Sequence, residues 1–535
     1  MNLDLLRRND WCGGQLLAFS GLDGPTDFDH NLVGRTAFGS PGIDIKLPGP
    51  CRIAFINKQP SLVTNDSFEL GTPPVLRGAF VDTHHLLIEG QCEIARHSEQ
   101  VKTTSRNSRL LVGSASHSDA AKIDTDLDAT LDARRRWLEQ QNVPATLSPK
   151  AQATLAKAFS VMKCQVCTAQ GNIRHRWTTP ARWPCKAMWL WDSIFHAIGW
   201  RHIDISMARD LLSAVLDTQY ETGFIAHALQ PNKTSHITQP PLLAFAARQV
   251  YEAGPNRDWI GQIYPKLCAY VSWDLANRDS DGAGLVEWFI EGEIHCRSGE
   301  SGMDNSPRFD AATQLDATDF NSYLALECQT LAHFATVLGR NHEAQRWLDQ
   351  HHSLCQLIDQ RLWSDKYKFY VDYDVDRNAS SDVLAGAGFL PLICGAASPQ
   401  QAQHLAAHMD NTQTFATAIP IPSVAAINPS HYAKDMWRGP TWAPLNWLVS
   451  FGFDRYGLHR QADDIRQKTI HEIERTCAKY NAMFEFFDDR GKVDPPALLR
   501  KGSCDPSNPY HQVFFDLGWT ATIYADWVLT NASPK

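Results

Sequence analysis

The feature that most constrains this chain is a helical hydrophobic period that runs from about residue 146 towards the C-terminus. Apolar residues recur there at the spacing of one helix face, and short and long connections alternate between the periodic segments. This pattern predicts paired helices wound into a closed ring, with the long loops collected at one mouth. The predicted helices span residues 148–168, 192–218, 240–253, 257–277, 313–338, 341–361, 398–408, 440–452, 455–478 and 511–530.

Residues 1–115 have the pattern of β-strands instead. Short apolar runs such as 42–47 and 85–89 are separated by Gly, Pro and Asn-Asp turn signals. They predict a compact β-sandwich-like domain of about six to eight strands. Residues 116–147 are polar and charged, and they predict a linker that becomes a solvated helix before a helical domain at 148–535.

The composition excludes several classes of protein. A net charge of −9 without a long basic run argues against a nucleic-acid partner, because phosphate binding needs a clustered positive field. No stretch of about 18 apolar residues is present, so no membrane-spanning segment is predicted. The 13 cysteines are an odd number, and the first residues do not resemble a signal peptide. We therefore expect free thiols in a cytoplasmic protein.

Tryptophan is unusually common, with 17 residues, many of them beside Gly, Pro or charged residues. Because Trp stacks on sugar faces, such clusters indicate a carbohydrate cleft, although Trp is also ordinary core material. Besides the loop around residue 304, four loops and the start of the last predicted helix carry these clusters or a flanking acid. The candidate residues in them are Trp189, Trp191, Asp192, His196, Gln239, Trp437, Arg438, Gly439, Trp442, Glu485 and Trp519.

Asp304 lies in the segment Glu300-Ser-Gly-Met-Asp-Asn-Ser-Pro-Arg308. Gly302 supplies backbone dihedrals that other residues avoid, and the proline behind Asp304 blocks helix continuation. Asp304 is thus either an ordinary turn residue or an acid presented at the tip of a rigid loop. Arg308 is predicted to bind a sugar oxygen or a neighbouring acid.

Two further polar residues have alternative roles. Asp192 follows two tryptophans at a predicted helix start, so its carboxylate caps the helix, binds sugar hydroxyls, or does both with its two oxygens. Gln239 offers a donor and an acceptor, which suits a sugar diol.

Glu485 is the second candidate for acid–base chemistry. It is flanked by Phe484 and Phe486, and burial among aromatic rings raises the pKa of a carboxyl group, which suits a proton acceptor. Glycosidic cleavage needs two acids, one to protonate the leaving oxygen and one to activate water on the opposite face. This chemistry requires neither a metal ion nor an organic cofactor, and its partner is a small carbohydrate.

These segments resemble glycoside hydrolase family 63 in the same order, over about residues 150–530, and the trehalases of family 37 carry a related Glu-Ser-Gly-x-Asp loop. The resemblance implies an all-α (α/α)6 barrel and an inverting exo-acting α-glycosidase that removes terminal α-glucose or α-mannose. Known relatives include mannosylglycerate and glucosylglycerate hydrolases. The resemblance assigns Asp304 as general acid and Glu485 as general base. It implies a −1 subsite lined by Trp191, Asp192, Gln239, Gly302, Trp437, Gly439 and Trp442.

Other functions fit the same pattern. A trehalase-like hydrolase of an osmolyte differs only in substrate. Sugar epimerases also use helical rings and transfer protons with histidine pairs, for which His196, His227 and His236 are candidates. A non-catalytic carbohydrate-binding protein would keep the cleft without the chemistry. The sequence leaves the sugar, the leaving group and a homo-oligomeric state open.

Overall fold

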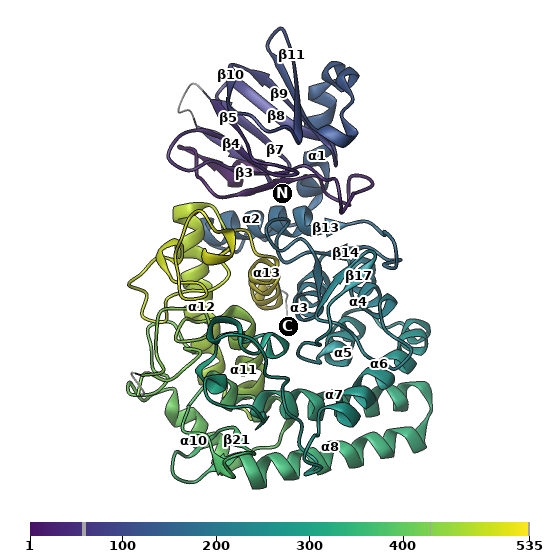
Figure 1. The fold of residues 1–535 in the computed structure, drawn as a ribbon, viewed down its shortest axis with the longest axis vertical. Helices are drawn as coiled ribbons and strands as arrows, with labels where there is room; N and C mark the ends of the chain where they lie inside the picture. Colours follow the sequence, from purple (N-terminus) through teal and green to yellow (C-terminus); the bar gives the residue numbers. More distant parts are fainter. Residues whose placement is uncertain (56–59, 428–429, 533–535) are drawn as a thin grey trace. The chain divides into compact units, whose positions relative to one another are not determined.

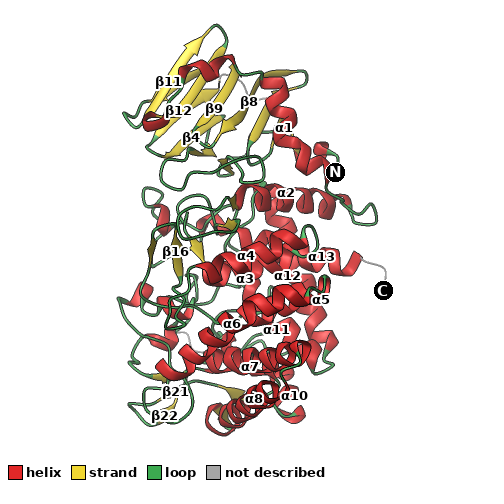
Figure 2. Ribbon diagram, turned by 90° about the vertical axis from the view of Figure 1, so that its right-hand side faces the viewer, coloured by secondary structure: helices red, strands yellow, loops and turns green. Residues whose placement is uncertain are grey.

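The computed structural model describes residues 1–55, 60–427 and 430–532, which form two compact units. The first unit contains residues 1–188, 473–484 and 514–535, and the second contains 189–472 and 485–513. Figure 2 shows the long strands gathered in the N-terminal part of the chain and helices through most of the remainder. Within the described ranges, no helix has the length and apolar character needed to span a bilayer.

The N-terminal residues form two antiparallel sheets around one shared core (Figure 1). Phe68, Ile88 and Val112 of the larger sheet and Ile43 and Ile53 of the smaller one are buried in it, as the period of two along a strand requires. In the described part of the chain, the seven-stranded sheet has the order β1 (Arg7–Arg8), β6 (Ser61–Val63), β7 (Ser67–Gly71), β8 (Pro74–Asp82), β9 (His85–Gly90), β12 (Arg109–Ser114) and β11 (Val101–Arg106). The five-stranded sheet has the order β10 (Cys92–Arg96), β5 (Cys51–Phe55), β4 (Gly42–Leu47), β3 (Val33–Thr36) and β2 (Leu16–Ala18).

The predicted sandwich-like layering is therefore present, but the expected number of strands was too low. Several strands, such as β1, β2 and β6, are only two or three residues long. A periodic pattern cannot be recognised in so few residues, so these strands are defined by their pairing partners.

Helix α1 (Leu127–Gln140) lies in the predicted linker, but it is not a solvated helix. Leu127 and Leu131 are buried against Ala79, Leu87 and Leu111. These three strand residues alternate with the core residues of the larger sheet, so α1 covers the other face of that sheet.

A buried polar network joins distant parts of the first unit. Lys157 Nζ donates to Asp516 Oδ2 at 3.0 Å and to Asn65 Oδ1 at 3.1 Å. Asp516 Oδ1 also accepts from the Met483 backbone N–H at 3.3 Å, and Thr520 Oγ1 donates to the Phe484 carbonyl at 2.7 Å. The network therefore fixes the two residues that directly precede Glu485.

The other helices follow the predicted period, with local differences. The predicted helix 192–218 is two helices, because Asp204 caps a new helix with its side chain. The predicted segment 511–530 becomes helical only at Gly518. The remaining helices are α2 (Pro149–Gln165), α3 (Leu190–Trp200), α4 (Ile205–Asp217), α5 (Leu243–Ala253), α6 (Arg257–Asn277), α7 (Thr318–Leu338), α8 (Asn341–Leu362), α9 (Pro391–Cys394), α10 (Pro399–His408), α11 (Ala443–Arg455), α12 (His459–Tyr480) and α13 (Gly518–Ala532).

Within the second unit, consecutive helices pack as pairs. Helix α3 packs on α4, and α7 packs along α8, as Figure 1 shows for the latter pair.

Short strands occur in the long loops between the helices of both units. They are β13 (Val166–Cys167), β14 (Trp177–Thr178), β15 (Met188–Trp189), β16 (Ala228–Gln230), β17 (Lys233–Thr234), β18 (Leu315–Asp316), β19 (Trp363–Ser364), β20 (Phe369–Tyr370), β21 (Tyr373–Asp374) and β22 (Ala379–Ser380).

Candidate active site

The loop that presents Asp304 is held from its N-terminal side by Glu300. This carboxylate is buried, and Arg278 donates to its two oxygens at 2.7 and 2.8 Å. The backbone N–H groups of Thr238 and Phe289 donate to the same carboxylate at 3.1 and 3.2 Å. Gly302, with φ of +69°, then turns the chain towards Asp304. Glu300 is therefore a structural acid that fixes the approach to Asp304.

Arg308 holds the other side of the loop, and its predicted contact with sugar is wrong. Its side chain is only 1% exposed. Nε donates to Asp372, Nη1 to Asp319 and to Met303 Sδ, and Nη2 to both carboxylates, at distances from 2.6 to 3.6 Å. A guanidinium has five N–H donors, and all five are used here. The alternative prediction, a neighbouring acid, describes Arg308 correctly.

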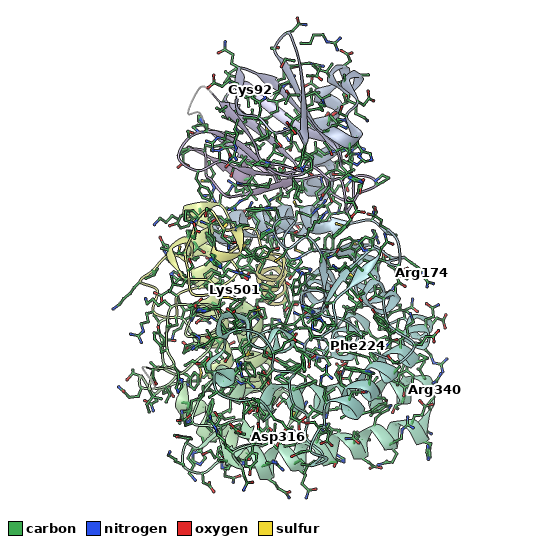
Figure 3. All side chains as sticks on the ribbon, viewed as in Figure 1. Cys92, Arg174, Phe224, Asp316, Arg340 and Lys501 are labelled. Carbon is green, nitrogen blue, oxygen red and sulfur yellow. The ribbon has the colours of Figure 1, made fainter. Side chains whose placement is uncertain are left out.

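Asp304 itself remains accessible, with 24% of its side chain exposed. Its Oδ2 lies 3.5 Å from Cys296 Sγ and 3.8 Å from Lys501 Nζ, and these two groups lie 3.4 Å apart (Figure 3 labels Lys501). Burial and the charge of Asp304 raise the pKa of Cys296, so the thiol is the hydrogen-bond donor. Asp304 is thus a partly exposed acid with an ammonium group beside it.

Glu485 is buried, with 6% of its side chain exposed. It also has a charged partner, which the flanking phenylalanines gave no reason to predict. Arg500 donates to both carboxylate oxygens, at 2.9 and 3.1 Å. Asp192 lies close enough that the charge of Glu485 acts on it. Burial, and after it this charge, raises the pKa of Asp192 well above its ordinary value and favours the protonated form.

Asp192 does not cap helix α3, because Trp189 is the N-cap residue and makes no side-chain capping bond. Asp192 lies instead in the first turn of the helix, buried. A protonated carboxyl at this position can donate a hydrogen bond as well as accept one.

A short segment that sequence reasoning missed connects the two candidate acids. Arg500 contacts Glu485, and the next residue, Lys501, contacts Asp304. The backbone N–H of Gly502 donates to Asp435 Oδ2 at 2.8 Å. Two acids from distant loops therefore contact consecutive residues of one segment. The only local signal was the basic pair Arg500-Lys501 before a glycine.

The predicted tryptophans form a row of stacked rings. Trp191 stacks with Trp437 at 6.1 Å between ring centroids, Trp437 with Trp442 at 4.0 Å, and Trp442 lies 4.7 Å from Phe486. Phe486 follows Glu485 directly. At the other end of the row, a Cβ atom on Gly302 would lie 2.5 Å from the Trp191 ring. The row thus runs from the Asp304 loop to the residue beside Glu485.

These rings are packed more tightly than a sugar platform would be. The three tryptophans are each about 1% exposed, so in this structure they form a rigid wall. Asn305 Oδ1 accepts from the Trp437 backbone N–H at 2.9 Å and ties the wall to the Asp304 loop. Direct contact between these rings and a sugar stays a prediction.

We expect Gly302→Ala to lower the melting temperature more than Gly457→Ala. Both glycines have φ of +69°, but a Cβ on Gly457 meets nothing within 4 Å. The two variants share the strain of a left-handed residue, roughly 1–2 kcal/mol. The clash with Trp191 adds about 1–3 kcal/mol only at position 302. Calorimetry measures the difference, and equal melting temperatures would contradict the close contact between Gly302 and Trp191.

The remaining residues that were predicted to bind substrate differ in what they contact. Gln239 Oε1 accepts from the Trp191 backbone N–H at 3.1 Å, and the Trp189 ring meets His227 edge-on. Burial lowers the pKa of His196 to about 3, so this histidine is neutral. Arg438 pairs with Asp310, and the Gly439 N–H donates to Ser423 Oγ at 2.8 Å. Trp519 belongs to the first unit.

Comparison with known proteins identifies the class of protein that carries these two carboxyl groups, the cationic segment and the aromatic wall as a glycoside hydrolase. Residues 186–491 match the family described as the mannosylglycerate hydrolase MGH1-like glycoside hydrolase domain. The chain belongs to this family, within glycoside hydrolase family 63.

Two curated relatives show the range of the family. The mannosylglycerate hydrolase of Thermus thermophilus is 28% identical over 385 residues, which are 57% of this chain and 91% of the relative. The glucosylglycerate hydrolase of Mycolicibacterium hassiacum is 22% identical over 415 residues, 57% of this chain and 88% of the relative.

Solved structures share the fold. The crystal structure of the family 63 mannosylglycerate hydrolase from Thermus thermophilus in complex with glucose has a TM-score of 0.57 at 24% identity, covering 70% of this chain and 100% of that one. The neutral trehalase of Saccharomyces cerevisiae has a TM-score of 0.53 at 16% identity, covering 67% and 76%. The resemblance to family 63, and more distantly to trehalases, is therefore confirmed.

Proposed function

We propose that this glycoside hydrolase is an inverting, exo-acting α-glycosidase that removes a terminal α-glucosyl or α-mannosyl residue from a small glycoside. Asp304 is the general acid and Glu485 the general base. The observation that supports the pair is that Arg500 and Lys501, consecutive in the chain, contact one acid each. We also propose that the helices close into an (α/α)6 barrel, which the helix pairs and the fold of the relatives support.

The surroundings of each acid suit its proposed role. Asp304 is exposed enough to reach the leaving oxygen, and once it has given up its proton, Lys501 at 3.8 Å stabilises the resulting carboxylate. Glu485 is held by two parallel hydrogen bonds from Arg500, which fix the plane of its carboxylate. Such orientation is what a base needs to aim a water molecule at the anomeric carbon. We further propose that Asp192, whose protonated form is favoured by burial and by the charge of Glu485, donates a hydrogen bond to a sugar hydroxyl.

The leaving group is the part of the substrate next to the general acid. An ammonium group beside Asp304 favours a leaving group that carries negative charge. The curated relatives are named for glycosides of glycerate, which is a carboxylate. We therefore place glycosides of a small hydroxy acid first and trehalose second. Cytoplasmic location and a homo-oligomeric state stay predictions.

The histidines give little support to an epimerase. His196 is neutral because burial lowers its pKa to about 3, and burial also lowers the pKa of His227. His236 is exposed and pairs with Glu291 at 2.9 Å. Proton transfer at a sugar carbon needs a histidine that titrates near neutral pH, and burial moves the pKa of both His196 and His227 below the ordinary value.

A panel of α-mannosyl-glycerate, α-glucosyl-glycerate, trehalose and maltose tests the proposal, with free sugar measured by chromatography. We expect hydrolysis of a glycerate glycoside at the highest kcat/KM. Trehalose as the best substrate would favour the osmolyte alternative. Isomerised sugar without cleavage would indicate an epimerase, and binding without any product would indicate a non-catalytic protein.

A further inference from the structure

The turn between β8 and β9 brings together three segments that are far apart in the sequence. Because β9 pairs with both β8 and β12 (Figure 2), the turn residue His84 lies beside the end of β12. The Ser114 N–H donates to the His84 carbonyl there at 3.0 Å. From the loop before β3, the Asp27 N–H donates to Thr83 Oγ1 at 3.2 Å. This loop and the segment that follows β12 therefore meet at the turn.

The side chains that meet there are three imidazoles and one carboxylate. One oxygen of Asp27 and one ring nitrogen each of His30 and His117 lie within 4.8 Å of one another. The His117 ring packs against His30 with 4.6 Å between ring centroids, and against His84 with 4.4 Å. Two imidazoles that bind one Zn²⁺ through nitrogens at about 2.0–2.1 Å have ring centroids about 4.5–5 Å apart. The spacing of His30 and His117 therefore fits a shared ion, and because both are exposed, small rotations can bring the three donors to bonding distance.

Hydrogen bonds orient two of the three donor groups. His84 Nε2 lies 3.0 Å from Asp27 Oδ2, and two backbone N–H groups of the same loop donate to Asp27 Oδ1 at 2.9 and 3.2 Å. Burial raises the pKa of Asp27, but these bonds outweigh it and lower the pKa below its ordinary value, so the carboxylate is ionised at neutral pH. His117 Nδ1 lies 2.9 Å from Ser116 Oγ, which leaves Nε2 available. Residues that bind a metal ion typically have such outer hydrogen bonds.

We propose that Asp27, His30 and His117 bind one divalent transition-metal ion such as Zn²⁺, and that His84 is a positioning residue that orients Asp27. Imidazole is a ligand that suits zinc and its neighbours in the first transition row, whereas Ca²⁺ and Mg²⁺ bind mainly oxygen donors. Three protein ligands leave the remaining coordination positions to water. The proposed catalytic acids belong to the second unit, so the ion takes no part in the proposed hydrolysis.

The place of the site within the first unit gives the ion a structural role. The Phe28 N–H donates to Gln170 Oε1 at 2.9 Å, and Lys186 Nζ donates to the Phe28 carbonyl at 2.9 Å. The loop that carries two of the three ligands is thus tied to residues 170–186. An ion that this loop shares with His117 joins those residues to the end of the larger sheet, and we expect it to stabilise the first unit.

Isothermal titration calorimetry with ZnCl2 tests the site on the full-length protein, freed of metal with EDTA and dialysed. We expect one Zn²⁺ per chain at this site and a higher melting temperature in its presence. His117→Ala should bind this ion at least tenfold more weakly, and His84→Ala, which removes the partner of Asp27, about 10–100-fold more weakly. The matched control His459→Ala, at a side chain that is 69% exposed, should bind Zn²⁺ like the wild type.

Titration with CoCl2 separates this site from binding by thiols, of which Cys296 is exposed. Co²⁺ held by nitrogen and oxygen has weak visible absorption, whereas a thiolate ligand adds a strong charge-transfer band in the near ultraviolet. We expect the visible absorption without that band, and its loss in His117→Ala.

Three results would overturn the proposal. One is the absence of saturable Zn²⁺ binding up to the millimolar range. Another is wild-type affinity in His117→Ala, which would place the ion elsewhere. The third is a thiolate band for the first Co²⁺ bound. These readouts are independent of glycosidase activity, so they are separate from the test of the proposed function.

Discussion

We expect Asp304→Asn to lower kcat by about 10²–10⁴ while the melting temperature stays near that of the wild type. The asparagine keeps the size of the side chain but has no proton that it can transfer to the leaving oxygen. The fold should survive because the loop is held by Glu300 and Arg308, not by the Asp304 side chain. Steady-state kinetics on the best substrate of the panel measures the loss.

The leaving group provides the control for this prediction. A glycosyl fluoride needs little protonation to depart, so Asp304→Asn should retain far more activity on it than on the natural glycoside. Asp376→Asn, at an exposed turn, should leave both activities unchanged. Similar losses on both substrates would show that Asp304 acts in some way other than as a proton donor.

The second large effect is on stability. Arg308→Met should lower the free energy of unfolding of the second unit by about 3–5 kcal/mol, because Asp319 and Asp372 would be left buried without their cation. Thermal and urea unfolding, followed by tryptophan fluorescence, measure the change. Adding Asp319→Asn and Asp372→Asn to the same chain should recover part of the loss, because the unpaired charges are then removed.

An exposed ion pair gives the comparison. Arg460 pairs with Asp410, and their side chains are 65% and 58% exposed. Arg460→Met should therefore change stability by less than about 1 kcal/mol. If Arg308→Met were as mild, the two buried ion pairs of Arg308 would not be what supports the Asp304 loop.

The sequence predicted the structure best where the signal lies in neighbouring residues. The helical period located most helices of the second unit, and the Gly and Pro residues around Asp304 indicated a rigid loop. The break between α3 and α4 was missed, although Asp204 is a good capping residue, because the apolar period continues through it. Residues 511–517 were assigned to a helix, but Phe515 bridges Phe484 in extended backbone.

The wrong and missed predictions for the site residues have one physical cause. Their hydrogen-bond and ion-pair partners lie far away in the chain. Arg308 looked like a sugar ligand because Asp372, 64 residues away, could not be placed beside it. Arg500 and Lys501 were missed because nothing local marks them as neighbours of Glu485 and Asp304. The aromatic context of Glu485 suggested an apolar pocket, whereas the fold brings a guanidinium to it. Only the fold supplies these pairings.

The most direct test of the proposed mechanism is an NMR time course that identifies the first anomer released from the best α-glycoside. A water molecule activated by Glu485 attacks the face opposite to the bond protonated by Asp304, so the configuration at the anomeric carbon inverts. We expect the β-anomer to appear first and then to mutarotate. Initial release of the α-anomer would mean retention, and it would contradict the roles proposed for Asp304 and Glu485.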